Sequence, residues 1–265
     1  MSDLNKEQTQ FGHRTVAEGE KSALVRGVFD SVAENYDVMN DLMSLGIHRL
    51  WKDRLVRQIR PRGGQKFLDV AGGTGDIAFR LYDKIGKSGR NRDIYKNGDI
   101  TVCDYNEEML RQGRARSIDR GTMNAFDWIT GNAESLPFPD YHFDVYTISF
   151  GLRNVPRIDT ALTEAYRVLK PGGRFYCLEF SHVDNPQLHK GYRLFSKSVI
   201  PRLGQMIAKD RDSYQYLIDS IEQFPGQNEL AARISHAGFS RVRYQNLSFG
   251  IAAIHQGMKA GTKNG

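Results

Sequence analysis

Cysteine is scarce in this chain of 265 residues, because only Cys103 and Cys177 occur. Both fall in segments predicted as strands, where single cysteines are better interpreted as small core residues than as a disulfide or a metal site. The seven histidines show no ligand spacing such as His-x-x-x-His. The sequence therefore predicts no metal ion.

Long hydrophobic runs are missing as well. None approaches the roughly 20 apolar residues that a helix needs to cross a bilayer, and the N-terminus has no apolar segment typical of a secretory signal. The first residues also include Asp3, Glu7, Glu18 and Glu20, whereas organelle transit peptides are poor in acids. We expect a soluble, cytoplasmic protein, and whether it lies at the inner face of a membrane stays open.

Acidic residues are outnumbered by basic ones, 31 against 37, which gives a formal net charge of +6. Such a balance indicates attraction to an acidic partner, either nucleic acid or an anionic membrane surface. One basic cluster has a simpler interpretation as the solvated face of a helix. Its members are Arg111, Arg114, Arg116 and Arg120.

The most informative stretch is Leu-Asp-Val-Ala-Gly-Gly-Thr-Gly at 68–75, followed by a helical pattern from Asp76. It predicts a strand, a glycine turn and a helix. The backbone of such a turn can approach a nucleoside closely, because glycine has no Cβ and tolerates positive φ. The turn also fits the glycine–alanine variant of the dinucleotide fingerprint, so a nicotinamide-dependent dehydrogenase is an alternative.

Acidic residues around the turn favour a different cofactor. Asp69 lies on the strand, and Asp76 in the first turn of the helix, where a carboxylate would repel a pyrophosphate. A cofactor with an ammonium and a sulfonium, such as S-adenosylmethionine, would be attracted instead. Asp104 ends the next predicted strand and is expected to accept hydrogen bonds from a ribose. Its structural alternative is the N-cap of the following helix.

Strand and helix patterns alternate along most of the chain, which predicts an α/β fold with a parallel sheet wound by helices. The expected strands are 66–71, 100–104, 126–130, 143–149 and 174–180, then 241–247 and 250–256 as a closing hairpin after a helix at 229–237. We divide the chain into a disordered polar tail 1–20, a helical cap 21–61, the main domain 62–258 and a disordered tail 259–265.

Two insertions interrupt the alternation. Residues 86–99 are polar and predict a surface loop. Residues 183–226 predict a helical insertion, whose apolar stripe would pack on the sheet, cover the substrate or touch a membrane. The stripe consists of Leu188, Tyr192, Phe195 and Val199.

Several further segments carry a family resemblance. They are Tyr36–Trp51 (Tyr-Asp-Val-Met-Asn to His-Arg-Leu-Trp), 131–138, 148–154 (ending Phe-Gly-Leu-Arg-Asn), 167–173 and 178–181. Together they resemble the ubiquinone/menaquinone biosynthesis C-methyltransferase (UbiE) family from about residue 11 to 258. The Leu-Lys-Pro-Gly-Gly turn occurs in many methyltransferases, whereas the first and third segments are much narrower signatures.

The resemblance implies a class I S-adenosylmethionine-dependent methyltransferase, with a Rossmann-like, mostly parallel seven-stranded sheet and N-terminal helices. It implies methylation of a ring carbon of 2-methoxy-6-polyprenyl-1,4-benzoquinol, of demethylmenaquinol or of both. In the implied site, Thr74 faces the methionine moiety, Asp104 the ribose, and Asn132 and Ala133 the adenine. The full set of implied cofactor contacts is Asp69, Gly73, Thr74, Gly75, Asp104, Asn132, Ala133 and Ser149.

Methylation at carbon also needs help for the acceptor, because a ring carbon is a poor nucleophile until a neighbouring hydroxyl loses its proton. We hypothesise that Arg153 stabilises the developing phenolate, that Asn154 orients the ring, and that Tyr36 and Asp37 contact the substrate. The alternative for Arg153 is a structural ion pair with a strand-end carboxylate. Tyr36 and Asp37 could equally cap and pack helices.

Other classes of function stay open, namely a methyltransferase acting on RNA or a small molecule and a non-catalytic scaffold in a quinone-biosynthesis complex. An RNA enzyme would usually show an Asn/Asp-Pro-Pro-Tyr/Phe motif, which this sequence lacks. The resemblance implies a lipophilic polyprenyl quinol as substrate, peripheral membrane contact, and a homodimer or a larger complex. No nucleic-acid partner is expected.

Overall fold

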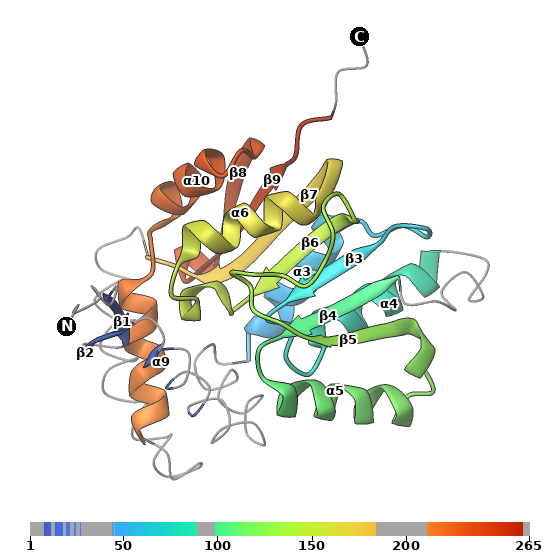
Figure 1. Cartoon of the computed structure of the whole chain (residues 1–265), viewed down its shortest axis with the longest axis horizontal. Coiled ribbons are helices and arrows are strands. Elements are labelled where there is room, and N and C mark those ends of the chain that lie inside the picture. Colours follow the sequence, from blue (N-terminus) through green and yellow to red (C-terminus); the bar gives the residue numbers. More distant parts are fainter. Residues whose placement is uncertain are drawn as a thin grey trace, which may run out of the picture.

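The computed structural model describes residues 8–11, 14–17, 20–21, 24, 27, 44, 46–88, 99–183 and 211–261. Its centre is a seven-stranded sheet with the order β5-β4-β3-β6-β7-β9-β8 (Figure 1). The strands are β3 Phe67–Val70, β4 Ile100–Asp104, β5 Phe126–Thr130, β6 Phe143–Ser149, β7 Leu169–Phe180, β8 Ser240–Leu247 and β9 Ala252–Met258. The α-helices are α3 His48–Ile59, α4 Asp76–Ser88, α5 Glu107–Asp119, α6 Ile158–Val168, α9 Arg211–Gln223 and α10 Gln227–His236.

Strand directions confirm the predicted sheet. Neighbouring strands from β5 to β7 pair in parallel, and β9 pairs antiparallel with both β7 and β8. The sequence predicted that this strand begins at residue 174, but β7 begins at Leu169. The extension arises because Gly172 and Gly173 exchange backbone hydrogen bonds with Lys259 beyond the end of β9.

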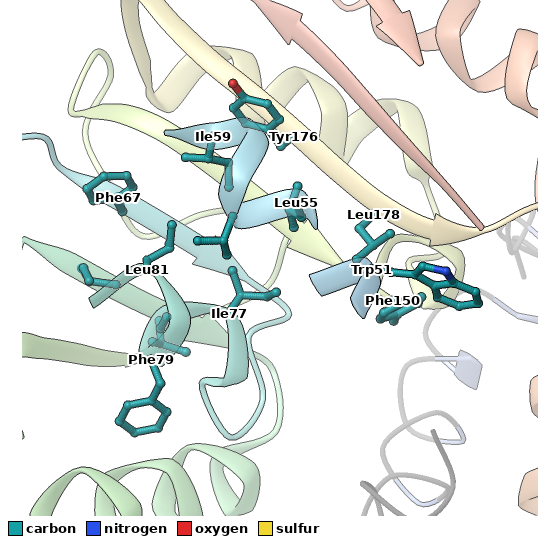
Figure 2. Close-up of a cluster of buried hydrophobic side chains, with 14 of the residues drawn as sticks. Trp51, Leu55, Ile59, Phe67, Ile77, Phe79, Leu81, Phe150, Tyr176 and Leu178 are labelled. Atoms are coloured by element: carbon teal, nitrogen blue, oxygen red, sulfur yellow. The ribbon is translucent and has the colours of Figure 1, made fainter. Parts of the chain in front are cut away.

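Two hydrophobic clusters cover the two faces of the sheet. Helices α3, α4 and α5 pack on one face, where Trp51, Leu55 and Ile77 meet alternate residues of the strands (Figure 2). Helices α6 and α10 pack on the other face, where Leu162 and Leu230 meet the intervening strand residues. Since successive strand side chains point to opposite faces, strands buried on both sides read as continuous apolar runs.

Both chain ends contain structure where the sequence predicted disorder. Within the tail 1–20, β1 Gln8–Phe11 and β2 Arg14–Ala17 form an antiparallel pair. Backbone hydrogen bonding between the two strands supplies an order that a polar composition does not reveal. At the other end, Lys259 is buried, and its Nζ donates to the carbonyl of Tyr166 at 2.6 Å. The predicted C-terminal tail therefore starts later than residue 259.

The predicted helical cap 21–61 contains α3, and the predicted helix at 229–237 is confirmed as α10 within a few residues. Helix α4 continues to Ser88 into the predicted loop 86–99, whose residues 89–98 lie outside the described part. The predicted helical insertion 183–226 contains α9. Its apolar stripe at 188–199 also lies outside the described residues. In the described residues, no helix is long and apolar enough to cross a membrane.

Candidate active site

A glycine turn joins β3 to α4 at the carboxyl end of the sheet. Gly73 and Gly75 have φ values of +53° and +81°, in the region that favours glycine. A Cβ on Gly75 would also lie 2.6 Å from the Trp128 ring. Both the backbone conformation and the lack of space therefore require glycine at this position, as the sequence motif indicated.

Asp69 lies in β3 directly before the turn. Its Oδ1 accepts a hydrogen bond from Thr147 Oγ1 at 2.7 Å, whereas its buried Oδ2 has no partner in the described residues. Burial raises the pKa of this carboxyl to about 7, although the hydrogen bond from Thr147 lowers it. Ser149 ends the neighbouring strand β6, and its buried Oγ likewise has no partner among the residues described. Two oxygens at adjacent strand ends are thus available to a ligand.

Asp104 ends β4 on the other side of β3. Its carboxylate accepts hydrogen bonds at 2.8 Å from the backbone N–H of Gly73 and from that of Asn106. Burial raises the pKa of Asp104, while these amide donors lower it. The N-cap of α5 is Asn106, whose side chain accepts from Met109 N, so the alternative interpretation of Asp104 as that cap is wrong.

The remaining cofactor candidates lie at the same edge. Thr74 is buried in the turn, and its Oγ1 is 3.4 Å from Arg116 Nη1. Asn132 and Ala133 follow β5, and the neighbouring Gly131 N–H donates to the carbonyl of Asp104 at 3.0 Å. The structure therefore brings together every residue predicted to contact the cofactor.

These residues fit S-adenosylmethionine. The turn at Gly73 and Gly75 lets the backbone lie at the carboxyl edge of the sheet without Cβ atoms. The oxygens of Asp69 and Ser149 that have no partner among the described residues can accept hydrogen bonds from a cationic group. A carboxylate has about four acceptor positions. Asp104 can thus accept from a ribose while it keeps its two backbone partners.

Asp76 does not act as the sequence argument supposed. Its carboxylate is bound by Lys52 Nζ at 2.6 Å and by Arg80 Nε at 2.9 Å. Burial raises the pKa of Asp76, but the charges of Lys52 and Arg80 outweigh burial and lower it overall. Because these cations offset the negative charge of the Asp76 carboxylate, this residue does not by itself argue against a pyrophosphate-containing cofactor.

The strand order distinguishes this fold from that of a nicotinamide-dependent dehydrogenase instead. A dinucleotide-binding sheet is parallel with the strand order 3-2-1-4-5-6. Here the antiparallel strand β9 lies between β7 and β8.

Arg153 is where the structure departs most from the hypothesis. Its guanidinium and the Glu179 carboxylate form an ion pair at 2.9 Å, and both side chains are only 2% exposed. The same Nη1 donates to the carbonyl of Phe150 at 2.6 Å. The geometry therefore matches the structural ion pair that was the alternative, while the buried Nε of Arg153 has no partner among the described residues.

Asn154, the residue predicted to orient the ring, is half-buried just after β6. It ends the short 3₁₀ helix η4 Leu152–Asn154 after β6, and its Oδ1 accepts from the Tyr216 hydroxyl at 3.1 Å. Burial raises the pKa of Tyr216, which keeps this phenol protonated. Tyr36 and Asp37 lie outside the described residues.

Sequence reasoning missed three members of the site: Glu179, Tyr216 and Lys52. Glu179 left a signal, because it is a carboxylate inside the apolar strand end Leu-Glu-Phe at 178–180. His48 and Trp51, which belong to the first segment of the family resemblance, are both buried. Trp51 Nε1 donates to Ser248 Oγ at 2.9 Å, and His48 Nδ1 lies 2.9 Å from Ser44 Oγ.

The sheet order and the glycine turn define the class of protein, a class I methyltransferase fold. A solved S-adenosylmethionine-dependent methyltransferase of Thermotoga maritima, described as a possible histamine N-methyltransferase, shares it with a TM-score of 0.61. The two are 19% identical, and the match covers 88% of this chain and 98% of that chain. This likeness confirms the predicted fold class.

The sequence comparisons define the family. The model of the ubiE/COQ5 methyltransferase family matches residues 15–259, and the chain belongs to this family. The ubiquinone/menaquinone biosynthesis C-methyltransferase UbiE of Cereibacter sphaeroides is 53% identical, over 98% of this chain and 100% of that protein. The mitochondrial 2-methoxy-6-polyprenyl-1,4-benzoquinol methylase of Oryza sativa is 52% identical, over 97% of this chain and 90% of that protein. Family membership confirms a methyltransferase that uses S-adenosylmethionine.

Proposed function

We propose that this chain transfers a methyl group from S-adenosylmethionine to a ring carbon of a polyprenyl benzoquinol, a polyprenyl naphthoquinol or both. The observation that carries the proposal is the sequence identity to relatives that are named for these reactions. It is 52–53% over nearly the full length of the chain. The unbroken glycine turn and the cluster of acceptors at the carboxyl edge support a catalytic role over a scaffold.

When bound, the cofactor supplies an electrophilic methyl group on a sulfonium. The chain's own residues hold and orient it: Asp69 and Ser149 offer acceptors at the ends of β3 and β6, and Asp104 offers one to the ribose. Fixing the methyl group against the ring carbon converts a bimolecular encounter into an oriented one, which lowers the barrier by positioning alone.

On the substrate side, Asn154 is the residue we assign to the quinol ring. Because Tyr216 occupies its Oδ1, its Nδ2 is left as a donor toward a ring oxygen. Arg153 acts as a positioning residue, since its bonds to Glu179 and Phe150 hold the turn that carries Asn154. Tyr36 stays a proposed substrate contact on the family motif alone.

An isoprenoid tail and a membrane contact need an apolar surface near this edge. Two large apolar side chains are well exposed there, Leu50 at 63% and Phe249 at 78%. Their sequence neighbours Trp51 and Ser248 share a hydrogen bond, so the two apolar side chains lie on the same part of the surface. We assign this surface to the tail of the quinol or to the bilayer that holds it.

The test uses labelled S-adenosylmethionine with short-tailed demethyl benzoquinol and demethyl naphthoquinol under reductant, and mass spectrometry to locate the methyl group. We expect a product methylated at carbon, and the product ratio gives the substrate preference. Gly75→Val should abolish transfer because the new side chain collides with Trp128, whereas the surface variant Arg111→Gln should not. Cofactor binding without any quinol product, or methylation of RNA instead, would contradict the proposal.

A further inference from the structure

A basic cleft lies at the opposite end of the sheet from the glycine turn. It has a volume of about 540 Å³ and is lined by the C-terminal half of α3, the early part of β7, the start of β8 and the end of β9. No acidic side chain is found among the described residues that line it. The six arginines in its lining are Arg54, Arg57, Arg60, Arg174, Arg241 and Arg243.

Three of these arginines have no partner within the part of the chain that the structure describes. Arg57, Arg60 and Arg241 make no side-chain hydrogen bond or ion pair with any residue that the structure describes. Elsewhere, by contrast, Arg111 and Arg233 are paired with carboxylates. The cleft thus gathers six of the chain's 37 basic residues, with no acidic side chain among its described lining residues.

The backbone presents two of the unpartnered arginines at some energetic cost. Arg60 closes α3 with φ +49°, at a position where helices usually place glycine. Arg241 has φ +52° and lies in an irregularity of β8, between its pairs Ser240 with Met258 and Arg243 with Gln256. A left-handed conformation costs roughly 1–2 kcal/mol for such residues, and bulges commonly redirect a side chain near a functional site.

A fourth arginine is held in place. Arg174 donates to the carbonyl of Ile59 at 2.6 Å and to the hydroxyl of Tyr176 at 3.2 Å, which fixes its guanidinium at the base of the cleft. Figure 2 shows Ile59 and Tyr176 together at one end of α3, with Trp51 at the other end. Arginine rather than lysine is the side chain suited to planar, bidentate recognition of phosphate.

We propose that this arginine cleft binds a soluble ligand that carries a diphosphate. One terminal phosphate carries about 1.5–2 negative charges near pH 7. Three unpartnered guanidinium groups therefore exceed the charge of a single phosphate and suit two linked ones. The cleft volume is within the range of small-molecule sites, roughly 300–1,000 Å³.

The position of the cleft favours a soluble source of the phosphate over a lipid headgroup. Strands β4 and β6 hold 5 and 7 residues, so at about 3.3 Å per residue the two edges of the sheet lie roughly 20 Å apart. A bilayer held at the arginines would leave the proposed quinol site at the far edge, away from the membrane. This choice of source rests on the proposed function, whereas the anion site itself does not.

The test is isothermal titration of the full chain with inorganic pyrophosphate, and separately with inorganic phosphate, at physiological salt. We expect one site, with pyrophosphate binding at least tenfold more tightly than phosphate. Arg57→Gln and Arg241→Gln should each weaken pyrophosphate binding by about tenfold, the loss of one charge-assisted contact. Arg111→Gln makes the same charge change on an exposed helix face and should leave the affinity unchanged.

Several results would overturn the proposal. These are no binding of pyrophosphate, an equal loss in Arg111→Gln, and association only with vesicles of phosphatidylcholine and phosphatidylglycerol. Preferential binding of RNA that is lost in both cleft variants would also overturn it. Circular dichroism of each variant separates a lost contact from a lost fold. Because the measurement involves no methyl transfer, its outcome is independent of the quinol assay.

Discussion

At the scale of single residues, Arg153 and Glu179 show how burial decides a role. Burial raises the pKa of Glu179, and the Arg153 charge and hydrogen bonds lower it. A charge removed from water in this way needs a partner, and removing that partner is costly. The pair also fixes the backbone, since Glu179 accepts from the N–H of Arg153 and from that of Phe180.

We therefore expect Arg153→Met to lower the free energy of unfolding by about 3–5 kcal/mol, because it leaves a buried carboxylate alone. The double variant Arg153→Met with Glu179→Leu should recover part of this loss. Urea unfolding of both variants measures the difference. A single variant that keeps its stability within about 1 kcal/mol but loses turnover would instead support direct stabilisation of a phenolate.

Asp69 gives a prediction for pH dependence. Its pKa is about 7 in the folded chain against 3.8 for an unperturbed group, because burial disfavours the charged form. A raised folded-state pKa contributes stability that is present below pH 3.8 and is lost as the pH rises through about 7. Asp69→Asn should remove up to about 4 kcal/mol of this dependence.

Urea unfolding at several pH values between 4 and 8 measures this pH dependence of the free energy of unfolding. It is compared for the wild type, for Asp69→Asn and for the exposed control Asp119→Asn. Equal pH profiles for all three proteins would show that Asp69 ionises normally.

At the scale of elements, α3 connects the two ends of the molecule. Its N-terminal half packs Trp51 against Phe150 and Phe180 near the site, and its C-terminal end lines the arginine cleft. Lys52, only 5% exposed, ties this helix to α4 through Asp76. The helix that follows the glycine turn and helix α3 are thus joined by this largely buried contact and by a second, more exposed ion pair between Arg80 and Asp53.

Lys52→Met should lower the free energy of unfolding by about 2 kcal/mol, the usual size of a buried contact to a charged group. Arg111→Ala removes an exposed pair within one helix and should cost less than about 0.5 kcal/mol. Chemical denaturation compares the two. If both variants lose the same stability, the contact between α3 and α4 contributes no more than a surface pair.

At the scale of the whole molecule, protection should decrease from the centre of the sheet to its edges. Strands β3 and β6 are covered on both faces and paired on both sides, whereas β8 is an edge strand with exposed alternate residues. Amide hydrogen exchange followed by mass spectrometry should therefore be slowest in Phe67–Val70 and Phe143–Ser149 and faster in Ser240–Leu247. Equal protection across the sheet would contradict a single central core.

Much of this architecture was readable from the sequence. The strands at 100–104, 126–130 and 143–149 and the glycine turn at 73–75 follow from local patterns, since periodicity and glycine report the conformation of the backbone itself. The predicted cofactor residues come together because each one ends, follows or leads out of a parallel strand, and the carboxyl ends of such strands share one edge.

The sequence by itself thus determined the elements, the family and the edge of the sheet that holds the cofactor site. Only the tertiary structure decided what the charged groups do. It paired Arg153 with Glu179, offset Asp76 with Lys52, docked Lys259, and gathered arginines from residue 54 to residue 243 into one cleft. The physical reason is that a charge acts through its burial and its neighbours in space, and both depend on packing between distant segments.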